Sequence, residues 1–108
     1  MVYLKNLWSD NMKVVTYLNI LYDYYGELLS DKQRSFFEDY YFNNLSLSEI
    51  SENNKISRNA VHKQIKSIEV KLKEYESKLK LYEKSIKLNK IIDNIKDEAL
   101  KNKLKELE

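Results

Sequence analysis

The chain has no cysteine and no proline, and Gly26 is the single glycine among its 108 residues. The absence of cysteine excludes a disulfide framework, a thiolate zinc site and a cysteine nucleophile. Because glycine and proline are the strongest turn signals, their scarcity favours a mostly helical fold. No apolar run approaches the roughly 18 residues that a membrane span needs, and the first residues lack the basic start and apolar block of a signal peptide. We therefore expect a cytoplasmic protein that does not insert into membranes.

Residues that carry catalysis are scarce as well. His62 is the only histidine, which excludes a two-histidine metal site and favours a surface position or a contact at the tip of a binding helix. The serine and acidic residues form no spaced catalytic set, and no glycine-rich phosphate loop is present. We expect no enzymatic activity, no metal and no cofactor.

Charge is abundant but unevenly distributed. One third of the residues are charged and the formal net charge is +2. Residues 1–52 hold four basic and eight acidic groups, whereas residues 53–68 hold Lys55, Arg58, Lys63 and Lys66 and no acid. A local basic surface is expected of an element that contacts phosphate groups. The solvated face of a helix in a lysine-rich protein has the same composition, so charge alone leaves both readings open.

Hydrophobic periodicity predicts a first helix from about Asp10 to Tyr25, with Gly26 at its end. Three capping signals then divide the middle of the chain into several short helices. They are the capping boxes of Ser30 with Gln33 and Ser46 with Glu49, and the cap residue Ser57. An aromatic run lies on the second helix at Phe36, Phe37, Tyr40, Tyr41 and Phe42. Neighbouring acidic residues discourage base stacking there, so we expect this run to form core.

Residues 46–66 have the pattern of a helix-turn-helix: a short helix to Glu52 or Asn53, a turn at residues 53–55, and a second helix from Arg58. Apolar contacts between the two helices are expected from Ile50, Ile56 and Val61. The N-terminal end of a recognition helix meets base edges in the major groove, where Arg pairs with guanine and Asn with adenine. The predicted DNA contacts are Lys55, Ser57, Arg58, Asn59, His62, Lys63 and Lys66. The alternative is a helical corner that contacts no nucleic acid.

The turn of this unit departs from the usual pattern at two positions. Asn54 stands where an apolar residue commonly fills the corner. Lys55 stands where Gly or Asn commonly takes the left-handed conformation. A neighbouring asparagine is the alternative for that conformation.

A heptad seam follows, and nothing between Arg58 and Leu88 signals the end of a helix. A helix of about 28 residues reaches roughly 42 Å. The seam either folds back over the aromatic helices or pairs with a second copy of the chain, and its length favours a homodimer. The predicted dimer interface is Ile68, Leu72, Tyr75, Leu79, Tyr82 and Ile86. A bend near Leu88–Lys90 and a separate terminal helix are expected after it.

The predicted fold is therefore all-α, with two continuous parts. Residues 1–66 form a helical bundle that contains the helix-turn-helix. Residues 67–108 form a long dimerisation helix and a short terminal helix, and they are not an independent domain.

Four segments together resemble the YlxM family of bacterial helix-turn-helix proteins. They are LLSDKQ at residues 28–33, SLSEI at 46–50, ISRNAV at 56–61 and YESKL at 75–79, and the resemblance extends over about residues 17–82. That family is similar to the DNA-binding region 4 of sigma factors, and its genes lie beside those of the signal recognition particle. The resemblance implies a regulator in that pathway. This sequence departs from the family at Asn59, where glutamine is usual, and at His62, where tyrosine is frequent.

Two functions remain open at this point. The first is a DNA-binding transcription regulator that acts as a homodimer on double-stranded DNA. The second is a dimeric helical adaptor that binds a protein or RNA component of the signal recognition particle without reading a DNA sequence.

Overall fold

The computed structural model describes residues 2–108, with side chains described from Lys13 onward, and this part of the chain is helical without any strand. The all-α prediction is confirmed. The elements are α1 (Val2–Tyr25), the 3-10 turn η1 (Gly26–Leu28), α2 (Asp31–Tyr41), α3 (Leu47–Asn54), α4 (Arg58–Leu79), α5 (Leu81–Asp93) and α6 (Glu98–Glu106). Among residues 2–108, no helix combines the length and the apolar character that crossing a membrane requires.

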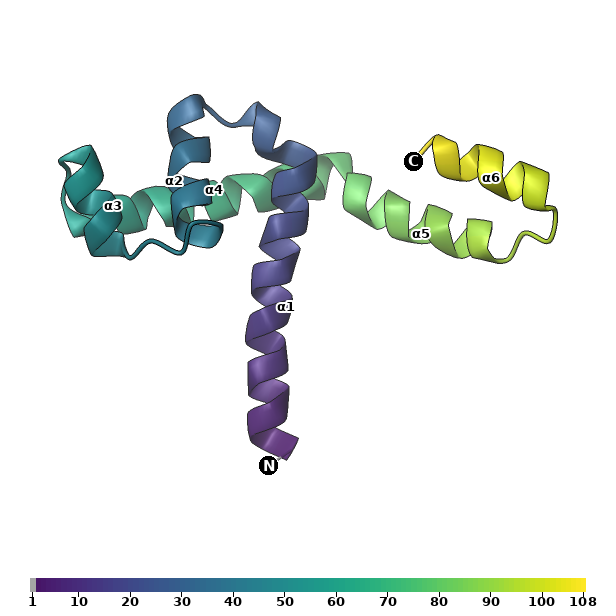
Figure 1. The fold of residues 1–108 in the computed structure, drawn as a ribbon, viewed down its shortest axis with the longest axis horizontal. Helices are drawn as coiled ribbons and strands as arrows, with labels where there is room; N and C mark the ends of the chain where they lie inside the picture. The colour runs from purple at the N-terminus through teal and green to yellow at the C-terminus, as the bar shows by residue number, and fades with distance from the viewer. Residues whose placement is uncertain (1) are drawn as a thin grey trace.

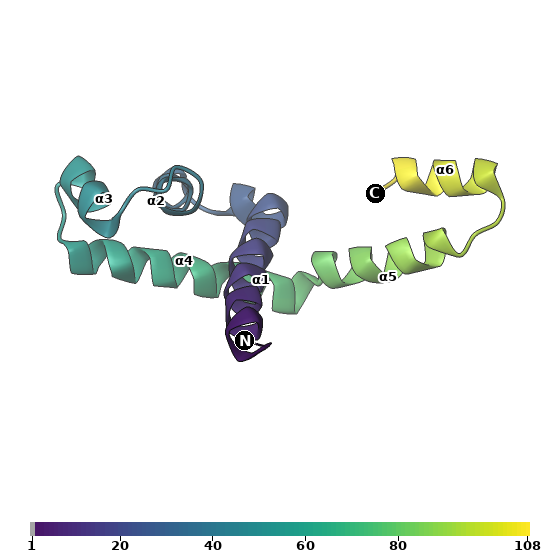
Figure 2. The ribbon, with the colours of Figure 1, turned by 60° about the horizontal axis from the view of Figure 1, so that its bottom comes forward.

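Helix α4 is the central element, because α1, α2 and α3 all pack against it. Figures 1 and 2 show α2 and α3 on one half of α4, with α1 crossing near its other end. The core lies where these helices meet. It consists of Leu18, Leu21, Tyr25, Leu29, Phe36, Phe37, Ile50, Val61, Ile65, Ile68 and Leu72.

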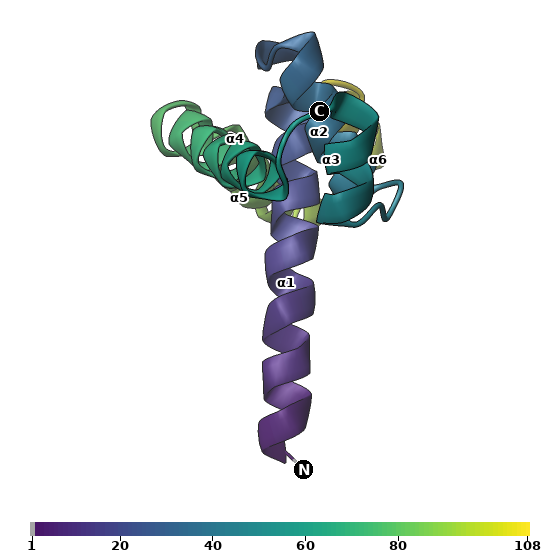
Figure 3. The ribbon, with the colours of Figure 1, turned by 90° about the vertical axis from the view of Figure 1, so that its left-hand side faces the viewer.

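Helix α1 begins earlier than predicted, at Val2 rather than near Asp10, since no glycine or proline interrupts the preceding residues. It ends at Tyr25 as predicted. Gly26 allows a close approach there, because a Cβ at this position would lie 3.1 Å from the Tyr22 ring. Figures 1 and 3 show that the N-terminal half of α1 projects away from the other helices.

Both predicted capping boxes are present. The Ser30 hydroxyl accepts from the Gln33 N–H (3.2 Å) and the Gln33 side chain accepts from the Ser30 N–H (3.0 Å). Ser46 and Glu49 make the same pair of bonds, each 3.1 Å long. These bonds satisfy backbone donors that a helix start otherwise leaves free.

The aromatic run is core on only one side. Phe36 and Phe37 are buried, and the Phe37 ring stacks on Tyr22 with centroids 4.3 Å apart. Tyr40 and Phe42 remain exposed, so the expectation of core holds for the face of α2 that packs on α4 and on Tyr22 of α1.

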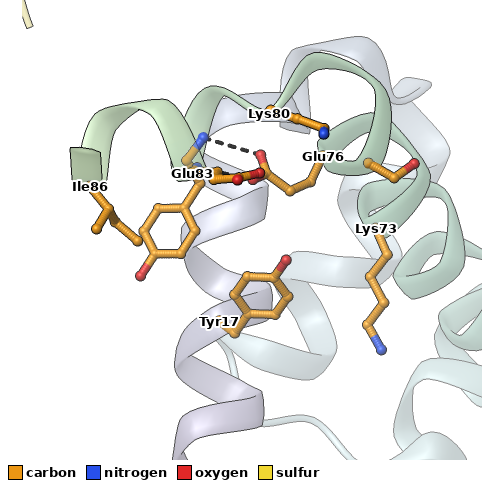
Figure 4. A pocket seen from close by; sticks show the side chains of 8 residues that line it. Tyr17, Lys73, Glu76, Lys80, Glu83 and Ile86 are labelled. Atoms are coloured by element: carbon orange, nitrogen blue, oxygen red, sulfur yellow. Dashed lines mark hydrogen bonds between the residues drawn. The ribbon is translucent and has the colours of Figure 1, made fainter. Parts of the chain in front are cut away.

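The prediction of an unbroken helix to Leu88, with a bend near Leu88–Lys90, is wrong. Helix α4 ends at Leu79, Lys80 takes a left-handed conformation (φ 56°), and α5 continues through the position of the predicted bend. The carboxylate of Glu76 stabilises this break. It accepts hydrogen bonds from the backbone N–H groups of Tyr82 and Glu83, both 3.1 Å long, at the start of α5 (Figure 4).

The predicted seam is divided by this break. Ile68 and Leu72 are fully buried within the single chain, as is Ile65, so the alternative in which the seam folds back over the aromatic helices holds for this first part. Leu79 and Ile86 remain exposed, and Tyr75 and Tyr82 are partly buried against the core. Ile68 and Leu72 therefore have no surface left for a second copy.

Candidate nucleic-acid interface

Helices α3 and α4 form the predicted helix-turn-helix. Ile50 of α3 and Val61 of α4 are both fully buried, which matches their predicted role between the two helices. Ile56 does not share this role, because 36% of its surface is exposed. It lies in the connection, where the chain has not yet entered α4.

The turn takes the left-handed conformation at the position where the pattern of a helix-turn-helix expects it. Lys55 itself takes the left-handed conformation (φ 56°, ψ 41°), and neither neighbouring asparagine replaces it. The Ile56 N–H donates to the Ser51 carbonyl (3.2 Å), and the Ser51 hydroxyl donates to the Ile56 carbonyl. This reciprocal pair closes the turn. Ser51 is small, as the close approach of two helices requires. Its hydroxyl also links α3 to the residue that follows the turn, through the bond to the Ile56 carbonyl.

Asn54 fills the corner through hydrogen bonds in place of apolar contact. Its side-chain amide donates to the Ile50 carbonyl (2.8 Å), and its side-chain oxygen accepts from the Lys32 ammonium group. Lys32 belongs to the first turn of α2, so this bond attaches α2 to the end of α3. The unusual residue at the corner is thus compatible with helix-turn-helix geometry.

Helix α4 begins as predicted. The Ser57 hydroxyl accepts from the Ala60 N–H (3.0 Å), and the first turn of α4 contains no acidic residue. A capped helix start carries a partial positive charge that favours an anion. The basic side chains and the helix dipole therefore both attract an anion to this end of α4.

All seven predicted contact residues are exposed: Lys55, Ser57, Arg58, Asn59, His62, Lys63 and Lys66. Val61 and Ile65 face the core. Asn59 is followed by His62 and Lys63 at three and four residues, and these are followed by Lys66 at four and three, so helical geometry places all four on the opposite, solvent-facing side. Within residues 13–108, Lys55, Arg58 and Lys63 take part in no ion pair.

Glu69 sets the boundary of this basic face. The Lys66 ammonium group lies 3.4 Å from one Glu69 oxygen, and the Tyr41 hydroxyl donates to the other at 2.7 Å. Burial, followed by this hydrogen bond to the carboxylate, raises the pKa of Tyr41. Tyr41 keeps Glu69 against α2, and Lys66 is partly held by the same carboxylate. Lys66 is therefore less free to reach a phosphate than Lys63.

The sequence of the chain matches a family model described as "Putative helix-turn-helix protein, YlxM / p13 like" over residues 12–108. The chain belongs to this family, UPF0122. The description of the family names a helix-turn-helix and no catalytic activity.

Curated relatives carry the same family name. The UPF0122 protein of Malacoplasma penetrans is 44% identical over 91 residues, which are 84% of this chain and 85% of the relative. A relative from a Thermoanaerobacter strain is 53% identical over 53 residues, and one from Oceanobacillus iheyensis is 50% identical over 54 residues. These two matches cover 49% and 50% of this chain and 45% and 51% of the respective relatives. The family resemblance inferred from the four sequence segments is confirmed.

Proposed function

We propose that this protein binds double-stranded DNA through its helix-turn-helix and acts as a regulator of transcription. The observation that carries the proposal is the exposed, acid-free basic face at the capped start of α4. Each helix of the unit contributes a buried side chain to the contact between them, Ile50 from α3 and Val61 from α4. Hydrogen bonds close the turn, and the outer face of α4 is exposed to solvent. These are the features with which such a motif docks in the major groove.

The proposed contacts fall into two groups. Arg58, Asn59 and His62 lie in the first turns of α4 and are positioned to meet base edges, which specify the sequence. Lys55 and Lys63, with a smaller contribution from Lys66, contact phosphates and position the helix. The backbone N–H groups at the Ser57 cap favour a further phosphate.

For the cellular setting we rely on the family resemblance. It supports a cytoplasmic regulator linked to the signal recognition particle pathway, which acts as a homodimer. The alternative is a dimeric adaptor that binds a protein or RNA component of that particle. The large apolar side chains exposed on α5 and α6 favour a protein contact somewhere on this part of the chain, and they suit either function.

Binding of labelled duplex DNA at about 50 mM salt tests the proposal, because phosphate contacts are strongest at low salt. The double variant Arg58→Ala/Lys63→Ala is expected to lose binding while its thermal unfolding stays unchanged, since both side chains are exposed. The matched control is Lys73→Ala/Lys78→Ala, which removes two positive charges from the exposed surface of the same helix. We expect the control to bind nearly as well as the unaltered protein.

The outcomes separate the two functions. If the unaltered chain forms no complex with random duplex DNA at low salt, DNA binding is excluded. If both double variants weaken binding equally, the interaction reflects net charge rather than the recognition surface.

A further inference from the structure

The chain exposes more surface than a folded monomer of its mass. A monomeric protein of this size is expected to expose about 6,300 Å², whereas this chain exposes 8238 Å². Its radius of gyration is 17.9 Å, against roughly 13 Å for a compact domain of the same length. The excess of about 1,900 Å² is the amount that each subunit of an obligate homodimer can bury.

Helices α5 and α6 form a hairpin that lacks a core of its own. They pack against each other as antiparallel neighbours at one end of the molecule (Figure 1). Ile92 is the one buried residue of α5, and α6 has none. Helices of this length owe most of their stability to packing. The start of α5 is held by α1, with Tyr82 partly buried against the core. The rest of the two helices has Ile92 alone as a buried side chain, so cover from outside the chain would stabilise the hairpin.

The apolar surface of the hairpin is continuous with a groove. The volume of this groove is ≈ 380 Å³, and its large apolar and aromatic lining residues are Leu81, Leu88, Leu107 and Tyr24. Its polar lining residues are Lys84, Ser85, Asn89 and Glu108. Each of the four large apolar and aromatic side chains is more than one third exposed, and Leu107 is 82% exposed. Helical spacing extends the surface to Ile91, three residues after Leu88, and to Leu100, seven residues before Leu107. Both are also exposed, Ile91 at 61% and Leu100 at 47%.

We propose that the α5–α6 hairpin is the homodimer interface and that its occupant is the same hairpin of a second copy. Two antiparallel helix pairs then form a four-helix bundle, in which each pair supplies half of the core. A two-fold symmetric interface uses the same patch on both subunits, so a self-complementary apolar surface satisfies both copies at once. The hairpin and the projecting part of α1 both extend from the bundle (Figure 1), so the hairpin holds a part of the excess exposed area, and a second copy of the hairpin would cover that part. This inference takes up the homodimer of the proposed function and moves its interface from the buried seam of α4 to the hairpin.

Sedimentation equilibrium of the full chain tests the interface. The unaltered protein is expected at twice its chain mass of 13.0 kDa. Ile91→Glu and Leu107→Glu place a charge in the proposed bundle and are each expected to raise the dimer dissociation constant by roughly 100-fold. Both side chains are exposed within one chain, so the first four helices should remain folded, which the buried aromatic side chains report by near-ultraviolet circular dichroism. Val70→Glu is the matched control, because it changes a 54% exposed residue of α4 outside the hairpin.

Each outcome has a distinct meaning. Dissociation of both hairpin variants, with an intact dimer for Val70→Glu, supports the proposal. A monomeric unaltered chain overturns both the hairpin interface and the proposed homodimer. An unaltered dimer that tolerates Ile91→Glu and Leu107→Glu overturns the hairpin interface alone. A further variant, Val14→Glu, changes a 54% exposed residue of α1. If this variant dissociates the dimer and the hairpin variants do not, the interface lies on α1 and the hairpin interface is overturned. DNA binding by the monomeric variants shows separately whether the recognition surface is intact.

Discussion

The Tyr25 hydroxyl donates a hydrogen bond to Glu76 Oε1 and accepts one from the Leu81 N–H at 3.1 Å. Tyr25 ends α1, Glu76 lies in the last turn of α4 and Leu81 begins α5. One end of each of these three helices therefore lies at the buried Glu76 carboxylate. Glu76 is 8% exposed, and its two oxygens also accept from the backbone of Tyr82 and Glu83. The contact fixes where the hairpin leaves the bundle.

Replacing Glu76 by alanine should therefore be costly. The change removes three hydrogen bonds to a charged group and leaves backbone donors of α5 without a partner. We expect the free energy of unfolding to fall by about 2–3 kcal/mol. Urea unfolding followed by circular dichroism measures it. Glu74→Ala on the same helix is the control, because its side chain is exposed and should change stability by less than about 0.5 kcal/mol. Equal effects of the two changes would show that the carboxylate does not stabilise the junction.

This junction also shows where sequence reasoning succeeds and fails. The capping boxes at Ser30 and Ser46 were predictable because each cap and its partner lie three residues apart. The break at Lys80 was not predictable, because no glycine or proline marks it. It depends on the Glu76 carboxylate, which bonds to backbone N–H groups six and seven residues later in the chain. It also depends on Tyr25, which lies 51 residues away from Glu76 in the sequence.

The same distinction applies to the candidate site. The exposed residues of α4 followed from local periodicity. The bonds that shape the turn did not: the Lys32–Asn54 contact crosses from α2, and the Ser51 hydroxyl bond depends on the final backbone path. The seam was read correctly as apolar, but periodicity cannot say whether a neighbouring helix or a second chain covers it.

Stability should depend on pH through Glu76. Burial opposes ionisation of this carboxyl, but the hydrogen bonds from Tyr25, Tyr82 and Glu83, with Lys80 nearby, outweigh it and hold the pKa of Glu76 below its ordinary value. A lowered folded-state pKa stabilises the fold above the unfolded pKa of about 4.3, and this contribution is lost as the pH falls through the folded value.

Glu76→Gln lacks this contribution. We expect the unaltered chain to exceed the glutamine variant in unfolding free energy by more at pH 7 than at pH 3. Urea titrations of both chains at these two pH values provide the comparison. A difference that is the same at both values would mean that ionised Glu76 adds no stability.

Lys80 carries a conformational cost that glycine would remove. Its φ of 56° lies in the left-handed region, which is unfavourable for residues with a Cβ atom and open to glycine. We expect Lys80→Gly to raise the free energy of unfolding by about 1 kcal/mol. Lys80→Ala is the matched control, since alanine loses the same side-chain charge but keeps the Cβ atom. Thermal or urea unfolding should rank glycine above alanine, and the reverse ranking would contradict a left-handed residue at this position.

Ser57 should contribute to stability at the start of the recognition helix. Ser57→Ala removes the hydroxyl that accepts from the Ala60 N–H, and loss of such a cap costs about 1 kcal/mol. Ser57→Asp keeps a capping acceptor and is expected to retain stability. It also adds a negative charge beside the proposed phosphate contacts, so DNA affinity should fall for Asp more than for Ala. Equal DNA affinity of the two variants would argue against a phosphate near this cap.

Asn59 is the sharpest test of base recognition. It is exposed in the first turn of α4. The amides of asparagine and glutamine can both pair with adenine in the major groove. Glutamine is longer by one methylene group, so its amide reaches a base edge that lies farther from the helix backbone. Selection of bound fragments from random duplex DNA should therefore give motifs for the unaltered chain and Asn59→Gln that differ at one or two adjacent base pairs. The free-energy difference between the preferred and the other bases at these positions should change by about 1–3 kcal/mol.

Asn102→Gln, an exposed change of the same chemistry on α6, is expected to leave the selected motif unaltered. Identical motifs from Asn59→Gln and the unaltered chain would show that Asn59 does not touch a base, and would leave Arg58 and His62 as the residues to examine.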